Sequence, residues 1–282
     1  MGYVSNSTGV LKKVMMARPE NVRLQPINVI SDRWIARGGK IDAAACLREH
    51  AELVETYEEN GVEVHFAPTR KDLTNQVFAR DFGACVAEGY VLGRFREPIR
   101  FGETGVYEAE LKKLGVPCAA KCRDGVFEGG DFWFLDNKTL AVGTVARTDA
   151  KGFASLEKQL KPLGYRMIRV PCPKDNLHLD MCFNIAAERV AVVCRDALPD
   201  FFLKMLKERK FELIDVAQEE VFQHHCNIQC IGAGRVVSFR SNREVNAKLR
   251  ALGLTVLDVE LHEILKMGGG PHCMTFPLLR DP

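Results

Sequence analysis

The chain has 282 residues, of which 46% are hydrophobic and 27% are charged, and its formal net charge is +2 at pH 7. This composition is typical of a globular protein that can bury a full core. The balanced charge, without a run of Lys and Arg interleaved with aromatic residues, argues against nucleic-acid binding and favours a small-molecule partner.

The sequence offers no apolar run long enough to cross a membrane and no basic and apolar leader at its start. We therefore expect no membrane association and a cytoplasmic location. Its ten cysteines are scattered, several of them inside apolar runs, which predicts reduced and buried thiols rather than disulfides. The spacings Cys118/Cys122 and His224–Cys230 resemble half of a metal site, but neither has a second half, so we predict no metal.

In chain order, five segments share one pattern: a helix signal, then a Gly or basic stop, then a β-rich run. They cover residues 52–68, 108–121, 156–171, 201–216 and 247–261. Four of the helix signals end at a glycine suited to a left-handed C-terminal position: Gly61, Gly115, Gly164 and Gly253. Ser241–Glu244 (SNRE) has capping-box spacing, and Pro199 suits a first helical turn.

Between these segments lie four hairpin signatures, each with two apolar runs joined by polar or glycine residues. They cover residues 82–95, 132–144, 182–194 and 227–239. A fifth hairpin is split between the chain ends, with residues 272–279 pairing with 9–19. The repeat of roughly 40 to 55 residues predicts a ring of five units closed by the two ends of the chain. An α/β sheet without closure is the alternative.

A ring would bring the starts of the hairpins to one point, and those starts carry reactive side chains. Asp81 lies in FARD, Glu128 and Asp131 in EGGD, His178 and Asp180 in HLD, and Cys273 in GGGPHC. On a strand, His178 and Asp180 would point to the same side. His272, next to Cys273, would point away from it. A glycine triplet costs conformational entropy and is used where a backbone bends sharply or approaches another group closely, which favours a nucleophilic role for Cys273.

Each of these motifs also has a purely structural explanation. Asp81 could form a surface ion pair with Arg80, Glu128 could be a solvated turn residue, and His178 and Asp180 could cap a turn. Cys273 could be one more buried apolar residue among the ten cysteines.

Taken together, the motifs resemble the guanidino-group modifying enzymes of the pentein superfamily, which comprise arginine deiminases, dimethylarginine dimethylaminohydrolases and amidinotransferases. The likeness runs over essentially the whole chain, from FARD through EGGD and HLD to GGGPHCMT. It implies an α/β fold, the five-bladed ββαβ propeller with a pseudo-fivefold repeat, formed by a single catalytic domain over residues 1–282.

The resemblance also implies roles for individual residues. Cys273 would attack the guanidinium carbon, His178 would act as general acid and base, and Glu128 would orient His178 or the substrate. The substrate-binding residues that it implies are Asp81 and Asp180 for the guanidinium, Arg147 for the substrate carboxylate, and Arg94 or Arg96 as a second carboxylate contact.

The chemistry requires these residue types. Carboxylates bind a planar guanidinium cation in bidentate fashion, and two of them fix its plane so that a thiol can meet the carbon. The covalent thiouronium that follows is hydrolysed by water, with His178 moving the protons. Carboxylates near a thiol raise its pKa, so thiolate formation needs help from His178 or from the incoming cation. No metal or organic cofactor is required.

Only 46 residues separate Asp81 from Glu128, a compact spacing that resembles dimethylarginine dimethylaminohydrolases. The HLD and GGGPHCMT motifs look closer to deiminases and amidinotransferases. We expect a hydrolase of arginine metabolism that acts on arginine or N-methylated arginine and releases citrulline with ammonia or an alkylamine. The alternatives are transfer of the amidino group to an amine, an arginine dihydrolase giving ornithine, and a non-catalytic propeller that binds a partner. The sequence leaves the oligomeric state open, a homo-oligomer included.

Overall fold

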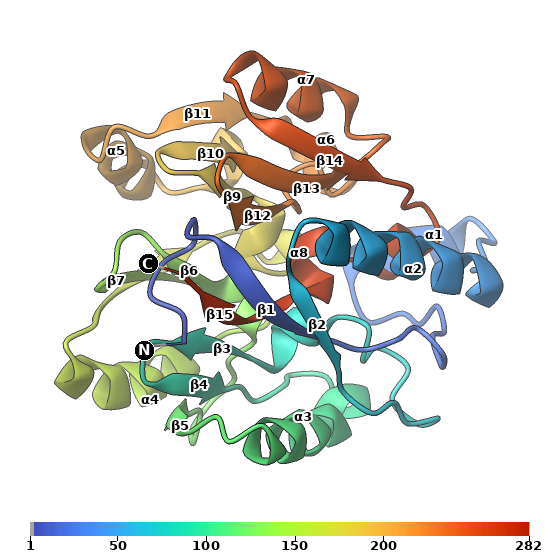
Figure 1. Ribbon diagram of the computed structural model, residues 1–282, viewed down its shortest axis with the longest axis horizontal. Coiled ribbons are helices and arrows are strands. Elements are labelled where there is room, and N and C mark those ends of the chain that lie inside the picture. The colour runs from blue at the N-terminus through green and yellow to red at the C-terminus, as the bar shows by residue number, and fades with distance from the viewer. Residues whose placement is uncertain (1–2, 282) are drawn as a thin grey trace.

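The computed structural model describes residues 3–281, and within them the strands form five three-stranded sheets set around a central axis (Figure 1). Each sheet is built from an antiparallel hairpin and a third strand that runs parallel to the second. Parallel neighbours cannot be joined by a tight turn, so a helix crosses between them in every blade. The predicted ring of five units is confirmed, and the alternative without closure is excluded.

The blades follow one another along the chain. Blade one has β3 (Gly83–Val86), β4 (Gly89–Leu92), α3 (Phe101–Lys113) and β5 (Cys118–Lys121). Blade two has β6 (Phe132–Phe134), β7 (Thr139–Thr144), α4 (Ala150–Leu160) and β8 (Arg166–Pro171). Blade three has β9 (Phe183–Ala187), β10 (Val190–Val193), α5 (Asp200–Glu208) and β11 (Glu212–Asp215). Blade four has β12 (Gln229–Gly232), β13 (Arg235–Phe239), α7 (Arg243–Ala251) and β14 (Thr255–Val259). Blade five has β15 (Phe276–Arg280), β1 (Leu11–Met16), α2 (Ala43–Glu59) and β2 (Glu63–Phe66).

Blade five closes the ring, because its hairpin joins the two ends of the chain. Strand β15 runs antiparallel to β1, with Val14 opposite Pro277 and Met15 opposite Phe276. The amide of Arg280 also donates a hydrogen bond to the carbonyl of Tyr3, at 2.9 Å. The predicted split hairpin is therefore confirmed.

The crossover helices α2, α3, α4, α5 and α7 lie on the outside of the ring and the hairpins lie inside (Figure 1). Neighbouring blades contact one another through the first strand of each hairpin, as β9 contacts β12 and β15 contacts β3. Apolar side chains fill the space between blades: the ring of Phe82 stacks on Tyr107 at 4.1 Å and on Phe276 at 4.2 Å. Such packing of large aromatic groups fixes the blades against one another.

The ends of the helices were predicted with mixed success. The four glycines all have positive φ: Gly61, Gly115, Gly164 and Gly253. The capping box over Ser241–Glu244 is wrong, because α7 begins one residue later, with Asn242 as an N-cap that makes no side-chain cap hydrogen bond. Pro199 lies at the N-cap of α5, just ahead of the first turn.

Three further helices lie outside this repeat, and the sequence patterns did not predict them. They are α1 (Val29–Ala36), α6 (Gln218–Val221) and α8 (Pro271–Met274). Helix α1 begins at Asn28, whose side-chain oxygen accepts hydrogen bonds from the amides of Ile30 and Ser31. None of the helices in residues 3–281 is long and apolar enough to span a membrane.

Candidate active site

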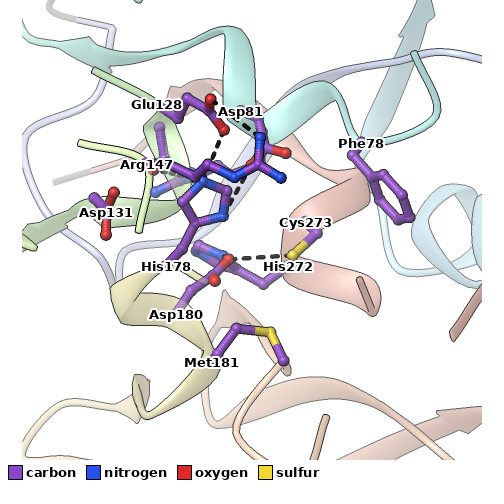
Figure 2. A network of polar contacts seen from close by, with 12 residues as sticks. Phe78, Asp81, Glu128, Asp131, Arg147, His178, Asp180, Met181, His272 and Cys273 are labelled. Carbon is purple, nitrogen blue, oxygen red and sulfur yellow. Dashed lines mark hydrogen bonds and ion pairs between the residues drawn. The ribbon is translucent and has the colours of Figure 1, made fainter. Parts of the chain in front are cut away.

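Short helical turns precede the inner strands and meet at one end of the central axis. They are η1 (Ala79–Phe82) before β3, η3 (Gly129–Asp131) before β6, η6 (Leu179–Met181) before β9, and α8 before β15. Turn η1 contacts both η3 and α8, and η3 contacts η6. The residues at the starts of the hairpins are therefore neighbours, as the ring predicted, although they are far apart in sequence (Figure 2).

Cys273 lies in α8, with 2% of its surface exposed. Its thiol donates to Oδ2 of Asp180 at 3.3 Å and accepts a hydrogen bond from Nδ2 of Asn227 at 3.0 Å. Burial, together with the charges of Asp180 and Asp81, raises the pKa of Cys273 well above that of a free thiol. The resting group is therefore a protonated thiol.

The three glycines before Cys273 allow the chain to pass close to its neighbours. Gly268 has a φ of +108° and ends the turn before α8. A Cβ on Gly269 would lie 2.6 Å from Cε1 of Phe78 and 2.7 Å from Cβ of Cys273. The amide of Gly270 donates to Oδ1 of Asn227 at 3.0 Å. These contacts explain why small residues are needed beside the thiol.

Asp180 holds α8 in place from the opposite side. Its Oδ2 accepts hydrogen bonds from Cys273 and from Nδ1 of His272, the latter at 2.8 Å. The ring of His272 also stacks on Trp133, with the ring centres 4.4 Å apart. Burial and the charge of Arg80 lower the pKa of His272 to about 4, so this histidine is neutral. The prediction that His272 lies on a strand and points away from Cys273 is wrong, because both residues lie in α8.

His178 and Asp180 do not lie on a strand either. His178 precedes the turn η6, which contains Asp180, and the two side chains have different partners. Nε2 of His178 donates to Oε2 of Glu128 at 2.9 Å, and its Nδ1 lies 3.7 Å from Oδ1 of Asp81 (Figure 2). Burial alone would lower the pKa of His178, but the carboxylates of Asp81 and Glu128 outweigh it and raise that pKa to about 10. The imidazole is therefore a cation at neutral pH.

Asp81 already binds a guanidinium group, that of Arg100. Nη1 of Arg100 lies 2.5 Å from Oδ2 of Asp81, and its Nε and Nη2 donate to Glu103 at 3.0 and 2.8 Å. All three side chains are buried. Burial raises the pKa of Glu103 to about 7, although Arg100 opposes that shift. Asp81 and Glu103 therefore show that this region of the site can bind a guanidinium ion.

These groups border one narrow cavity. It has a volume of about 20 Å³ and is lined by Asp81, Arg100, Arg147, His178, Cys273 and neighbouring apolar residues. Ile27 and Asn28, just before α1, form part of its wall, and Asn28 donates from Nδ2 to the carbonyl of Met267 at 2.9 Å. A cavity of this size holds only one or two water molecules.

Of the arginines predicted to bind the substrate, only Arg147 lies in the cavity. It is buried, and its Nη1 lies 3.4 Å from Oε1 of Glu97 and 3.8 Å from Oε1 of Glu128, while its Nη2 donates to the carbonyl of Ile27. Arg94 and Arg96 are exposed and do not line the cavity. The guanidinium of Arg96 contacts Asp149, and its backbone amide donates to Glu128. The geometry does not support a substrate contact by either side chain.

Two polar residues of the site were missed in the sequence. Arg100 lies only four residues beyond Arg96, and no local pattern distinguishes it from the other arginines of that segment. Asn227 could have been found, because it opens the fourth predicted hairpin at the position where the other blades carry their polar residues. With Asn227 included, all five blades contribute a polar side chain to the site.

The carboxylates and the histidine also form the one cluster in residues 3–281 that a metal ion could approach, made up of Asp81, Glu128 and His178. However, Nε2 of His178 is bound to Glu128 itself, and Arg100 and Arg147 supply positive charge beside the two carboxylates. The metal-like spacings around Cys118 and His224 form no such cluster in the described chain.

Comparison with known proteins gives a consistent result. A family model described as N,N dimethylarginine dimethylhydrolase, eukaryotic, matches residues 18–280. Protein YkgA of Bacillus subtilis is 32% identical over 96% of this chain and 93% of its own length. An arginine deiminase of Bacillus cytotoxicus is 28% identical over 78% of this chain and 65% of its own length. The N-terminal domain of ArgZ, a cyanobacterial arginine dihydrolase, superposes with a TM-score of 0.84 at 22% identity over 95% of this chain and 97% of its own. The expected pentein fold is confirmed.

Proposed function

Because the chain belongs to the family of eukaryotic N,N dimethylarginine dimethylhydrolases, we propose that it hydrolyses the guanidinium group of arginine or an N-methylated arginine. The products are citrulline and ammonia or an alkylamine. The observation that supports this proposal most directly is the single cavity bordered by the thiol of Cys273, the cationic imidazole of His178 and the carboxylate of Asp81. The family and its arginine deiminase relatives support the same class of guanidino-acting enzyme.

When the substrate binds, it displaces Arg100 from Asp81. Its guanidinium takes the place of the Arg100 guanidinium on Asp81, and Arg100 keeps its bond to Glu103 while turning to the substrate carboxylate. Arg147, the second arginine of the cavity, binds the same carboxylate. This exchange leaves Asp81, Arg100 and both charged ends of the substrate paired, which is important because an unpaired charge in so buried a site is costly.

Cys273 is the nucleophile. The substrate cation and loss of the thiol proton to Asp180, its hydrogen-bond acceptor, generate the thiolate, which forms a bond to the guanidinium carbon. His178, which is protonated at neutral pH, gives its proton to the departing nitrogen as the C–N bond breaks. The neutral His178 then takes a proton from water, whose oxygen attacks the thiouronium carbon. As the C–S bond breaks, the proton of the new hydroxyl passes to the departing sulfur, which restores the thiol and releases citrulline. Asp180 gives the proton that it took from Cys273 to the released ammonia or alkylamine. Glu128 holds the imidazole through its Nε2 hydrogen bond.

The test is to incubate the pure protein with arginine, monomethylarginine and dimethylarginine and to quantify citrulline, ornithine, ammonia and alkylamines. Citrulline with a matching amount of amine is the expected result. Ornithine with two equivalents of ammonia would instead identify an arginine dihydrolase, the activity of ArgZ. A new guanidino compound that forms only when glycine is added would identify an amidinotransferase.

The covalent step has its own test. The variant Cys273→Ser is expected to lose at least 10³-fold in kcat, because a serine hydroxyl is a far weaker nucleophile in this site. Cys118→Ser, which removes an exposed thiol in another blade, is the matched control. Mass spectrometry of the quenched wild-type protein should show an adduct on the peptide that contains Cys273. Full turnover by Cys273→Ser would contradict the mechanism. If the wild type turns over none of the guanidino compounds, a non-catalytic propeller is favoured instead.

A further inference from the structure

A second cavity is bordered by His272 and Trp133. It is lined by Arg80, Arg280, Gln229, Trp133 and His272 together with neighbouring residues of the inner strands. None of the residues that line it also lines the cavity at Cys273. Nothing in the proposed reaction uses this second cavity.

Two of its wall residues are buried arginines without a carboxylate partner. The side chains of Arg80 and Arg280 are bound only to carbonyl oxygens: Arg80 to Gly129 and Phe132, and Arg280 to Gly9 and Cys230. Residues 3–281 place no carboxylate within ion-pair distance of either guanidinium group. Arg80 is only 8% exposed and Arg280 only 4%. Buried charges in proteins are normally paired, so these two are exceptional.

The charges along the axis do not balance on this side. Asp180 is the carboxylate that most favours the charge of Arg80, but it is bound to His272 and Cys273. Burial lowers the pKa of Arg80 to about 10, with Asp180 opposing that shift, and burial lowers the pKa of Arg280 as well. Two guanidinium ions against one carboxylate leave one positive charge, which a single monovalent anion would neutralise.

The cavity also offers polar atoms that no protein group satisfies. Nε1 of Trp133 is a buried donor, and Oε1 of Gln229 a buried acceptor, that lack partners among the described residues. The volume is about 20 Å³, and a cavity needs roughly 10–15 Å³ to hold one particle of the size of water. It adjoins a larger groove of about 610 Å³, with which it shares Asn6, Ser7 and other wall residues, so ions can reach it from solvent.

We propose that this cavity, the axial anion site, binds one chloride-sized anion between Arg80, Arg280 and the indole N–H of Trp133. Water bridges the anion to Gln229. This site is independent of the proposed hydrolysis, because it shares no lining residue with the catalytic cavity.

Bromide is the probe. Crystals of the full chain grown in sodium bromide are expected to give an anomalous peak between Arg80 and Arg280. In solution, the midpoint of thermal unfolding should rise by about 5 °C between 1 and 100 mM bromide or chloride, at ionic strength held constant with gluconate. A cavity that contains only water in the bromide crystals would overturn the proposal. An unfolding midpoint that is the same in halide and in gluconate would also overturn it, even if the crystals show an anomalous peak.

Two variants locate the effect. Gln229→Glu places a carboxylate in the wall at nearly constant size, so it should raise the unfolding midpoint in gluconate and abolish the halide dependence. Arg280→Gln should also abolish that dependence, and if it does not fold, Gln229→Glu decides alone. Arg209→Gln, at the mouth of the adjoining groove, is the matched control and should keep the halide effect. Retention of the halide effect by Gln229→Glu would contradict the site. Cys273→Ser should bind bromide like the wild type, which separates this result from the fate of the proposed reaction.

Discussion

At the residue scale, the role of an arginine depends on whether its guanidinium group reaches the cavity beside Cys273. Arg94, Arg96 and Arg100 lie within seven positions of one another, yet only Arg100 is buried against Asp81 and Glu103. Arg100 is held there because its guanidinium donates to both carboxylates in the geometry that such pairs prefer.

We predict that Arg100→Lys will raise KM for arginine about tenfold or more, because the bidentate contact to the substrate carboxylate is lost. The same variant should bind agmatine, the decarboxylated analogue, as the wild type does. Steady-state kinetics with both substrates is the measurement. Arg94→Lys is expected to change neither value by a comparable factor, and a larger effect at Arg94 than at Arg100 would show that the contact has been assigned to the wrong residue.

His178 links the charge of the site to the stability of the fold. Its pKa is about 10 in the folded protein and about 6.5 in an unfolded chain, so the folded state binds more protons between these values. The stabilisation by His178 is therefore fully present below pH 6.5 and is lost as the pH rises towards 10.

We predict that the unfolding free energy of the wild type falls more steeply from pH 6.5 to 9 than that of His178→Gln. Urea denaturation across this range measures it. The comparison is made between two proteins because buried thiols with raised pKa values, such as Cys85, also reduce stability as the pH rises through the pKa of the unfolded thiol. Parallel pH profiles for the two proteins would show that His178 titrates as in an unfolded chain.

At the scale of single elements, the short helical turns before the inner strands determine where the polar groups point. The sequence motifs FARD, EGGD and HLD contain residues that the structure brings together, but the prediction that His178 and Asp180 share one side of a strand is wrong. A one-turn helix rotates consecutive residues by about 100 to 120°, so His178 reaches Glu128 while Asp180 reaches α8.

The repeat itself was readable because each blade carries a helix signal followed by a β-rich run. Four of the five blades place a glycine with positive φ between the two, and blade three has Lys210 there. The elements that the sequence did not reveal are those outside the repeat. Helix α1 is short, and its N-cap Asn28 is fixed by a distant residue, Met267, so local pattern alone could not indicate its place beside the site. The side-chain partners of Arg100 likewise depend on packing between α3 and η1.

We predict that Gly269→Ala will reduce kcat by at least tenfold and destabilise the fold by about 1–3 kcal/mol, because the added methyl group overlaps Phe78 and Cys273. Gly105→Ala is the matched control, since its Cβ meets nothing within 4 Å and it lies inside α3, where alanine is the better helix former. Thermal unfolding and steady-state kinetics of both variants test this. Equal behaviour of the two variants would mean that the triplet is not a steric requirement.

At the scale of the whole molecule, the ring is held shut by main-chain hydrogen bonds between residues from the two ends of the chain. The amide of Asp281 donates to the carbonyl of Val10, and that of Arg280 to Tyr3. The fifth blade is therefore continuous in space but interrupted in sequence, whereas the other four are continuous in both.

A circular permutant should consequently keep the fold. Joining the two ends through a short Gly-Ser linker and opening the chain at the exposed turn between Asp136 and Lys138, which connects β6 to β7, moves the break from blade five to blade two. We expect native circular dichroism and at least a tenth of the wild-type kcat. An unfolded permutant would show that the closure of blade five is needed at an early stage of folding.

The convergence of all five blades at the axis has a consequence for how such activities diverge. Asp81, Glu128, Asp180, Asn227 and Cys273 lie near the starts of five equivalent hairpins, so a gene built by repeated duplication of one ββαβ unit would inherit five equivalent positions facing one another. In this chain Asn227 is the one of the five whose side chain neither ionises nor acts as a nucleophile, and it holds the thiol of Cys273 and the amide of Gly270 through hydrogen bonds instead.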